Sequence, residues 1–505
     1  MIISEIQSKL AKWSTENKNR KFDRLLRLIA SRDWLREAAI RTLKSSGSKT
    51  PGIDGIDRSA FAEKLDGNIE TIRAELLSGI YKPLPARRVY IPKANGTLRP
   101  LGIPSLKDRV IQRAMLMAME PIWESDFHRD SYGFRPARSV HHSIRAVKLT
   151  LQDGSEHTSG RWVIEGDLTS YFDTVHHQLL MGCVRKRICD QRFLDLLWKL
   201  LKAGCIDKGL FCAAHEGVPQ GGVLSPLLSN IMLNEFDQWL ENRYLCKKAR
   251  KDRWSWNFSL NRPIAAREGR KWLPAVSYSR YADDFVVIVK GTKQQAEVIR
   301  EECRQYLENQ LKLQLNMDKT ALTHVNDGFT FLGHRIIRKR GPKGNMRTVT
   351  QIPIKKFQSF ATKIVQELSD NYDVDKLKMV ESLNRKIRGW SNFYQFTDFA
   401  AVMFSKMDRV LFWKFGYWLS RKYRLNLREV IKRWVRYPKN KNAKTWIVYG
   451  KGHTGRGCGA ELQRMLGAGK KQFRWKTLSG NPYLTTLEPN KIFESLYRDV
   501  ATAMS

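Results

Sequence analysis

The chain has 505 residues and a formal net charge of +39, with 89 Lys and Arg against 50 Asp and Glu. Its 42% hydrophobic content and 15 Trp exclude a disordered chain, and its length allows about two to four domains. So large an excess of cations indicates a polyanionic partner, most often a nucleic acid, because phosphate neutralisation releases counterions.

Cysteine usage and hydropathy narrow the class of protein further. The seven cysteines include no C-x-x-C pair, which disfavours a structural zinc site and indicates reduced thiols. No stretch approaches the roughly 18 consecutive apolar residues of a membrane helix, and the N-terminal sequence shows no apolar signal region. We therefore expect no membrane contact and a cytoplasmic protein associated with the nucleoid or with ribonucleoprotein.

Helices and a hairpin are expected in the first quarter of the chain. Residues 1–45 carry apolar positions at helical spacing, and a Gly/Pro/Ser-rich loop follows at residues 45–57. After a further helical pattern, Asn95-Gly96 separates two strand-like runs, as in a β-hairpin. Residues 106–124 are then predicted to form an amphipathic helix.

The middle of the chain mixes strands with helices. Residues 161–175 are predicted as strand, turn and helix, and residues 216–240 as a Gly-rich turn that leads into a long helix. Residues 247–272 are basic and Trp-rich without clear periodicity, which indicates an insertion or an extended loop. A β-hairpin is expected over residues 276–291, followed by a helix over residues 293–313.

The last third of the chain is predicted to be mainly helical. One more strand is expected in residues 328–339, and residues 354–435 show a helical, basic pattern. Beyond Pro438 the chain is rich in Gly and Lys, which indicates a small separate domain. From Arg385 to the end, 25 Lys and Arg stand against 7 Asp and Glu, which favours binding to a nucleic-acid backbone. Mixed strands and helices followed by helices indicate an α+β fold with an appended helical domain.

The acidic pair Asp283-Asp284 stands at the turn of the expected hairpin, directly before the apolar run FVVIV. Two neighbouring carboxylates repel each other, so they need a counter-charge, and oxygen ligands suit Mg²⁺. Asp167, at the end of another apolar strand, is a candidate third ligand; a helix N-cap is the alternative at such a junction. Three Asp around two Mg²⁺ ions are the arrangement that drives nucleotidyl transfer.

Eight motifs, in order over residues 45–400, carry a resemblance to a known family. They read KTPGIDG, IPKANGTLRPLGIPSLKDRVIQ, SYGFRPARSVHHSI, GDLTSYFD, GVPQGGVLSPLLSNIMLNEFD, YADD, LNMDKT and FTFLGHRI. The series resembles the reverse transcriptases and maturases encoded by group II introns. The resemblance implies a right-hand polymerase with fingers and palm, then a helical thumb or X domain, then a small basic domain. The implied parts are a helical N-terminal extension (1–60), fingers and palm (61–345), thumb (346–437) and a basic nucleic-acid-binding region (438–505).

The resemblance also implies roles for single residues. Asp167, Asp283 and Asp284 would bind two Mg²⁺ ions, for which Mn²⁺ could substitute, and the substrates would be deoxynucleoside triphosphates. Five residues would contact the incoming nucleotide: Lys93, Arg99, Phe172, Gln220 and Lys319.

Alternatives stay open at several of these nucleotide-contacting positions. Phe172 would exclude a 2′-hydroxyl from below the sugar, and a core Phe is the alternative. Lys93 and Arg99 would reach the triphosphate from the two arms of a hairpin, and Lys319 would protonate the leaving pyrophosphate. On so basic a protein, each of these three is also explained as a solvated surface charge. Gln220 lies in PQGG, whose glycines let the backbone approach a base pair closely.

The closing motifs are predicted to hold primer and RNA. Gly333, in FLGH, lies where the family has its primer grip. Arg385, Lys386 and Arg388 lie in ESLNRKIRGWSNFYQF, which resembles the maturase thumb, and they are candidates for RNA contact. The interleaved aromatic residues have i, i+3, i+4 spacing and are expected mainly to pack in the core: Trp390, Phe393 and Tyr394.

The leading hypothesis is an RNA-directed DNA polymerase that binds its group II intron RNA or another RNA template and assists splicing and mobility. It would extend a DNA primer or a target DNA. An HNH endonuclease is not expected, because Cys458 is the single cysteine after Cys303, so the primer would come from elsewhere, for instance a replication fork. Two alternatives stay open: a maturase acting mainly as an RNA-binding splicing factor, and a domesticated relative in DNA repair, phage defence or a CRISPR system. A homodimer also stays open.

Overall fold

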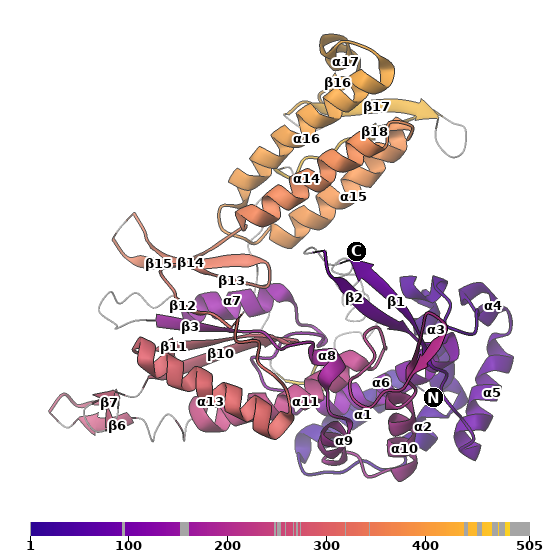
Figure 1. Ribbon diagram of the computed structural model, residues 1–505, viewed down its shortest axis with the longest axis vertical. Coiled ribbons are helices and arrows are strands. Elements are labelled where there is room, and N and C mark those ends of the chain that lie inside the picture. Colours follow the sequence, from indigo (N-terminus) through magenta and orange to yellow (C-terminus); the bar gives the residue numbers. More distant parts are fainter. Residues whose placement is uncertain are drawn as a thin grey trace. The chain divides into compact units, whose positions relative to one another are not determined.

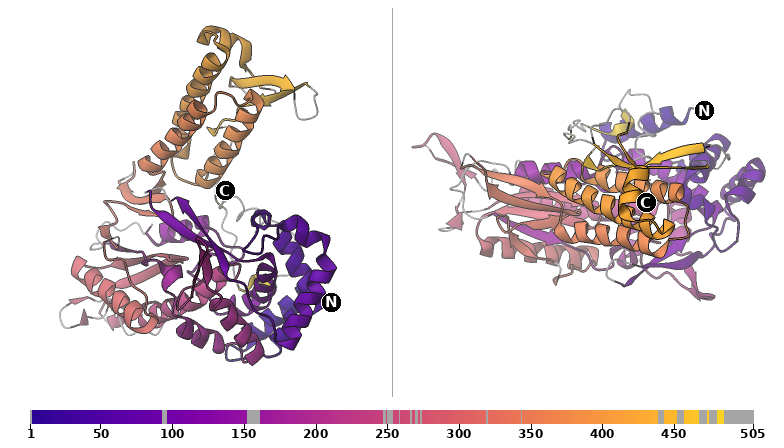
Figure 2. Two further views of the ribbon diagram at one scale, coloured as in Figure 1. Left: turned by 45° about the vertical axis from the view of Figure 1, so that its right-hand side comes forward. Right: turned by 90° about the horizontal axis from the view of Figure 1, so that it is seen from above.

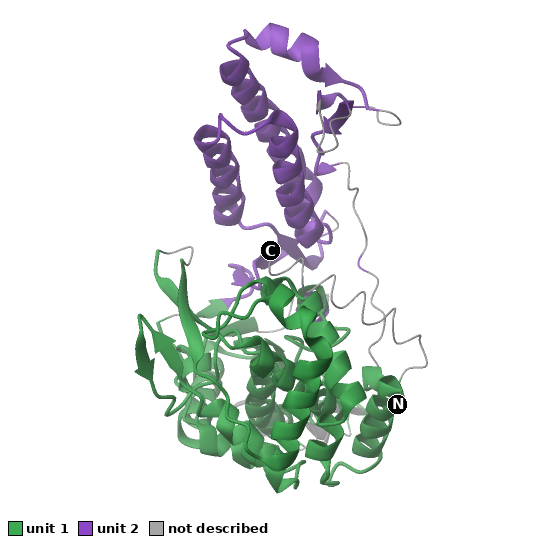
Figure 3. Cartoon of the chain, turned by 90° about the vertical axis from the view of Figure 1, so that its right-hand side faces the viewer, with its two compact units in different colours: residues 1–143, 158–323, 477–492 green, residues 144–157, 324–476, 493–505 purple. Residues whose placement is uncertain are grey.

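The structure is a computed structural model of the chain (Figure 1). It describes residues 2–92, 96–151, 161–246, 249, 254–257, 259–265, 267–268, 271–272, 274–318, 320–342, 344–438, 443–451, 457–466, 473 and 480–484. The chain divides into two compact units (Figure 3). The first unit comprises residues 1–143, 158–323 and 477–492, and the second comprises residues 144–157, 324–476 and 493–505.

Helices form much of the first unit, and their apolar faces meet in one core. The helices predicted over residues 1–45 and 106–124 are confirmed. α1 (Ile3–Glu16) and α3 (Arg32–Lys44) pack against α6 (Leu106–Trp123), and the buried Trp34 of α3 donates its indole N–H to the Ala114 carbonyl at 2.9 Å. The remaining helices of this region are α2 (Leu25–Ile29), η1 (Ser46–Lys49), α4 (Arg58–Glu63), α5 (Leu65–Ser78), α9 (His177–Arg185) and α10 (Gln191–Leu201).

Two distant segments donate hydrogen bonds to backbone carbonyls of α6 at and before Pro121. Pro121 has no N–H, so the carbonyl of Met117, four residues earlier, lacks its helical donor. The side chain of Gln7, on α1, donates to that carbonyl at 2.8 Å. The carbonyl of Pro121 itself accepts from the side-chain amide of Asn481 at 2.7 Å. Both bonds satisfy backbone groups near the helix end.

The segment that carries Asn481 belongs to the first unit, although it follows residues 324–476 of the second unit in sequence. It forms a short 3₁₀ turn, η4 (Pro482–Leu484), that packs on α1. The Tyr483 hydroxyl donates to the Glu120 carboxylate of α6, and the Asn481 amide also donates to Ser125 Oγ at 2.8 Å. The chain therefore returns to the first unit near its C-terminal end.

A four-stranded sheet of the first unit has the order β10-β11-β3-β12. β10 (Ala275–Tyr281) and β11 (Asp284–Lys290) form the predicted hairpin, and β11 pairs antiparallel with β3 (Arg161–Gly166), while β12 (Leu322–His324) is the other edge. Phe285 to Val289 of β11 are all buried. One reason is the predicted long helix α11 (Ser225–Leu240), whose Phe236 ring lies 5.2 Å from that of Phe285. α13 (Lys293–Leu311), also predicted, packs against β3.

A second sheet of this unit has the order β2-β1-β4-β5. β1 (Ala86–Pro92) and β2 (Leu98–Ile103) pair antiparallel, which confirms the predicted hairpin, although its tip at residues 93–95 lies outside the described residues. The other two strands are β4 (Cys205–Asp207) and β5 (Leu210–Cys212).

The basic, Trp-rich stretch at residues 247–272 differs from the expected loop. It contains two short antiparallel pairs, in which alternate residues hydrogen-bond across. The four strands are β6 (Trp254–Asn257), β7 (Arg262–Ala265), β8 (Arg267–Glu268) and β9 (Lys271–Trp272). A π-helical turn, η2 (Glu241–Leu245), connects α11 to this stretch.

Helices dominate the second unit, as predicted. Figures 1 and 2 show α14 (Ile354–Asp370), α15 (Lys376–Tyr394) and α16 (Ala400–Tyr423) running side by side, with α17 (Leu427–Trp434) after them. A three-stranded sheet precedes the helices: β13 (Phe329–Phe331), β14 (His334–Arg340) and β15 (Met346–Gln351). α7 (Val140–Thr150) enters this unit with its second half.

The residues just beyond Pro438 differ from the separate domain expected there. Strands β16 (Val435–Arg436), β17 (Thr445–Lys451) and β18 (Gly457–Glu461) form a sheet within the second unit. The reason is Trp446, which is fully buried and donates its indole N–H to the Phe412 carbonyl of α16 at 2.8 Å. A side chain on Gly416 would fall 2.6 Å from this ring, so the glycine makes room for it. No helix in the described part of the chain is long and apolar enough to cross a bilayer.

Candidate active site

Backbone pairing brings the predicted acidic residues to one end of the first sheet. Tyr281 pairs with Asp284 across a two-residue turn, in which Ala282 has a left-handed φ of 57° and Asp283 follows it. β11 and β3 pair Phe285 with Gly166, so continuing this register by one residue places Asp284 opposite Asp167. Residues opposite each other in an antiparallel ladder point to the same face. All three acidic residues therefore lie at the same end of the sheet, where the adjacent strands β3 and β11 meet the turn.

The surroundings of Asp283 disfavour the charge on its carboxylate. Burial raises the pKa of Asp283 and the negative charge of Asp167 raises it further, and a backbone hydrogen bond and the charges of Arg99 and Arg280 only partly offset this rise. A divalent cation bound by these oxygens would reverse that balance, and carboxylate oxygen suits Mg²⁺. Among the described residues, however, no three His, Cys, Asp or Glu side chains lie close enough together to hold a metal ion. The donor type fits a metal, and the side chains would have to converge on it.

Two glycines allow the backbone to come close at this end of the sheet. A side chain on Gly133 would fall 2.2 Å from the Ala282 nitrogen, so the loop that carries Gly133 lies directly against the turn. A side chain on Gly166 would fall 2.1 Å from the Phe285 ring. Any larger residue at either position would displace the strands that carry the acidic residues.

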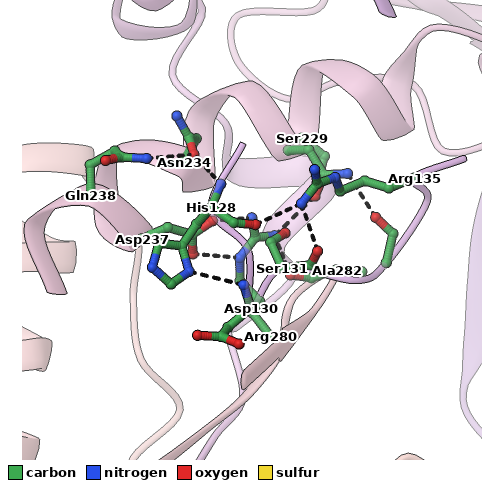
Figure 4. A network of polar contacts seen from close by, with 12 residues as sticks. His128, Asp130, Ser131, Arg135, Ser229, Asn234, Asp237, Gln238, Arg280 and Ala282 are labelled. Atoms are coloured by element: carbon green, nitrogen blue, oxygen red, sulfur yellow. Dashed lines mark hydrogen bonds and ion pairs between the residues drawn. The ribbon is translucent and has the colours of Figure 1, made fainter. Parts of the chain in front are cut away.

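A buried ion pair supports the same turn from behind (Figure 4). Arg280 and Asp237 have fully buried side chains and form two hydrogen bonds, Nε to Oδ1 at 2.8 Å and Nη2 to Oδ2 at 2.5 Å. Arg280 Nη1 also donates to the Ala282 carbonyl at 2.9 Å and to Asn230 Oδ1 at 3.0 Å. The Tyr278 hydroxyl donates to Asp237 Oδ1 at 2.7 Å. Burial disfavours the charge on Arg280, yet Asp237 holds the pKa of this guanidinium above its ordinary value.

Sequence reasoning did not identify this ion pair. Asp237 is the last residue of the quoted motif GVPQGGVLSPLLSNIMLNEFD, and Arg280 directly precedes YADD. An acidic residue on the apolar face of a predicted helix was the available signal, because such a residue is rarely buried without a partner. A single chain does not reveal which cation that partner is.

The structure describes three of the five predicted nucleotide-contacting residues, Arg99, Phe172 and Gln220. Arg99 is an exposed residue of β2, paired with Ile91, and its charge acts on the carboxylate of Asp283. Lys93 and Lys319 lie outside the described residues.

Phe172 and Gln220 lie in two segments that hydrogen bonds join, α8 and the PQGG turn. Phe172, on α8 (Tyr171–Thr174), is half-buried against the core, so both the gate and the core interpretation stay consistent with its position. Its carbonyl accepts from Val218 N at 2.7 Å, and the Gln220 amide donates to Asp173 Oδ2 at 3.2 Å. Gly102 of β2 donates its N–H to the Gln220 carbonyl at 2.7 Å. The PQGG turn thus joins β2 of the second sheet to α8, the helix that follows β3.

The predicted primer and RNA contacts lie in the second unit. Gly333, in the turn between β13 and β14, has a φ of 75°, and its carbonyl accepts from the Tyr394 hydroxyl at 3.2 Å. Arg385, Lys386 and Arg388 are exposed on α15, and Lys386 forms an ion pair with Glu367 at 2.7 Å.

The prediction that the aromatic residues of α15 pack in the core is confirmed. Tyr394 is buried, and Trp390 and Phe393 pack against the same core. The Trp390 ring stacks on that of Phe360 at 5.0 Å.

Comparisons with known proteins agree with this geometry. Residues 91–336 match the family model for reverse transcriptase (RNA-dependent DNA polymerase), and residues 357–442 match that for the group II intron, maturase-specific domain. Protein YkfC of Escherichia coli (strain K12) is 66% identical over 366 residues, which cover 72% of this chain and 96% of that protein. The group II intron-encoded protein LtrA of Lactococcus lactis subsp. cremoris is 30% identical over 446 residues, which cover 77% of this chain and 73% of LtrA. The putative COX1/OXI3 intron 2 protein of Saccharomyces cerevisiae is 32% identical over 323 residues, 58% of this chain and 36% of that protein.

The sheet with its acidic turn and the first family match define a reverse transcriptase, an RNA-directed DNA polymerase of mixed α and β structure. The maturase-specific domain and the relatives narrow this class: the chain belongs to the group II intron reverse transcriptase and maturase family. The predicted family, fold class and enzyme class are confirmed. Reverse transcriptases depend on divalent metal ions, and the maturase-specific domain implies binding to intron RNA.

Proposed function

We propose that Asp167, Asp283 and Asp284 bind two Mg²⁺ ions and catalyse RNA-templated DNA synthesis at the end of the β10-β11-β3 sheet. The observation that supports this proposal is the register of β11 and β3, which, continued by one residue, would bring Asp284 opposite Asp167, next to Asp283 in the turn. When bound, the metal ions would activate the primer 3′-hydroxyl and stabilise the pyrophosphate that leaves. Mn²⁺, of similar ligand preference, would substitute.

The residues around the acidic turn would orient the substrate. Arg99 would hold the triphosphate of the incoming deoxynucleotide, because its charge already acts on the catalytic end of the sheet. Phe172 would lie below the sugar and exclude a 2′-hydroxyl, and Gln220 would contact the nucleotide and template. Lys93 and Lys319 keep the roles proposed from the sequence, on the incoming triphosphate and the leaving pyrophosphate.

Intron RNA, an RNA template and a DNA primer or target would be the partners. Arg385, Lys386 and Arg388 are exposed on α15 and would contact RNA phosphates, while Gly333 would hold the primer end. The protein would thereby assist splicing of its intron and copy the intron RNA during mobility.

Primer extension on an RNA template, with Mg²⁺ and deoxynucleotides, tests the proposal. We expect Asp283→Ala and Asp167→Ala to abolish DNA synthesis, and Asp66→Asn, an exposed position on α5, to leave it intact. Binding of a group II intron RNA by the same variants, measured without nucleotides, should be unchanged. If Asp283→Ala still makes DNA at a rate near that of the wild type, the metal site is misassigned.

A further inference from the structure

α16 presents one uninterrupted exposed stripe along its length. Its apolar residues, Phe404, Met407, Leu411, Phe415, Trp418 and Leu419 among them, are buried in the core of the second unit. Its exposed side chains recur at intervals of three and four residues, so they lie on the opposite face. Five of them, hereafter the α16 stripe, are Lys406, Arg409, Trp413, Tyr417 and Arg421. Ala401, Val402, Ser405 and Lys414 of this helix are exposed as well. From first to last they span about 22 Å of helix.

The α16 stripe has two large aromatic rings in its middle and cations at both ends. Trp413 is 43% exposed and Tyr417 is 50% exposed, although both residue types are usually much less accessible. Within the described residues, neither Lys406 nor Arg409 forms an ion pair with a carboxylate. The one acidic residue of the helix, Asp408, is buried on the other face, where it accepts from Met465 N at 2.7 Å. The five residues of the stripe therefore include three cations, two aromatic rings and no carboxylate.

This composition decides between classes of partner. Trp, Tyr and Arg are also common at protein interfaces, so the rings alone do not exclude a protein partner. Three cations with no carboxylate among them, in a chain of net charge +39, favour a polyanion instead. A nucleic-acid duplex offers phosphates to the cations. Its bases, however, are already stacked on each other, so their faces are not free to stack on Trp413 and Tyr417. Unpaired nucleotides supply both a phosphate chain and free base faces. Charge and ring placement thus fit single-stranded RNA.

We propose that the α16 stripe binds an unpaired segment of RNA, with Trp413 and Tyr417 stacking on bases and Lys406, Arg409 and Arg421 contacting phosphates. This site is distinct from the α15 residues assigned above and rests on the proposed function only in that the family binds intron RNA. Trp413 and Tyr417 lie four residues apart, so two successive stacked bases would follow the helix axis.

Equilibrium binding of the full chain to a short poly(U) strand and to an RNA duplex of equal length, without nucleotides, tests this proposal. We expect Trp413→Ala and Tyr417→Ala each to weaken poly(U) binding about tenfold and to change duplex binding less than twofold. Trp413→Phe should bind nearly as well as the wild type, whereas Trp413→Leu should not, because only a ring can stack. Trp13→Ala removes a similarly exposed Trp, at 38% exposure on α1, and is the matched control.

The salt dependence of RNA binding tests the role of the charged residues of the α16 stripe separately. The double variant Lys406→Gln, Arg409→Gln should weaken both RNAs and reduce the slope of log affinity against log salt by about two, one for each lost phosphate contact. Equal losses on poly(U) and duplex for the ring variants would overturn the proposal, as would unchanged poly(U) affinity. So would a dimer of the wild type that Trp413→Ala abolishes, since the stripe would then be a protein interface. Because no DNA synthesis is measured, failure of the metal site leaves these outcomes unaffected.

Discussion

Replacing Asp237 by Asn should both destabilise the first unit and disturb the acidic turn. The substitution keeps the shape of the side chain but leaves the fully buried guanidinium of Arg280 without its negative partner. Breaking a buried pair in this way costs about 3–5 kcal/mol, whereas an exposed pair contributes less than about 1 kcal/mol. Arg280 also holds the Ala282 carbonyl, so its displacement moves the residue before Asp283. We expect lower DNA synthesis as well as lower stability.

Urea unfolding measures the first effect and primer extension the second. Asp66→Asn is the matched control, because Asp66 pairs with Arg36 at 2.9 Å while both side chains are at least half exposed. A double-mutant cycle with Asp237→Leu and Arg280→Met separates pairing from packing: the double variant should be more stable than either single variant. A loss below about 1 kcal/mol for Asp237→Asn, or additive losses in the cycle, would refute the view that this pair supports the turn.

Four further outcomes follow from the geometry. Gly133→Ala should reduce DNA synthesis sharply, because the new Cβ falls 2.2 Å from the Ala282 nitrogen, while RNA binding by gel shift stays unchanged. Phe172→Ala should raise ribonucleotide incorporation about tenfold in primer extension, and no rise would favour a purely structural Phe. Trp446→Ala should lower the unfolding free energy of the second unit by about 3–5 kcal/mol in a urea titration. Burial raises the pKa of Glu120 to about 7 from 4.5, so the folded state holds a proton that the unfolded state has lost. The free energy of unfolding should therefore be highest below pH 4.5 and fall by up to about 3 kcal/mol as the pH rises to about 7. Glu120→Gln should remove this pH dependence.

The sequence predicted those parts of the site that depend only on residues close together in the chain. The hairpin of β10 and β11 follows from the strand-like pattern on either side of a tight turn. Asp283 and Asp284 are recognisable from the motif YADD alone. Asp167 was recognisable because it ends an apolar strand. Its alignment with Asp284, in contrast, depends on the register between β3 and β11, which are more than a hundred residues apart.

Contacts between distant segments were not predictable from one chain. The ion pair between Arg280 and Asp237 forms only when α11 packs against β10. Nothing in the sequence around either residue identifies the other as its partner. The same holds for Trp446, whose place between Phe412 and Gly416 assigns the strands beyond Pro438 to the second unit. Gly- and Lys-rich composition indicated a separate domain there, because composition does not reveal what one buried ring contacts.

The return of residues 480–484 to the first unit has a consequence for how the protein is made. A ribosome releases the chain from its N-terminal end, so α6 emerges long before Asn481, the residue that satisfies the Pro121 carbonyl. The polymerase unit thus completes this packing only after residues 480–484 have been translated. A truncated product that ends after the maturase-specific domain would contain every proposed catalytic residue and still lack this last attachment.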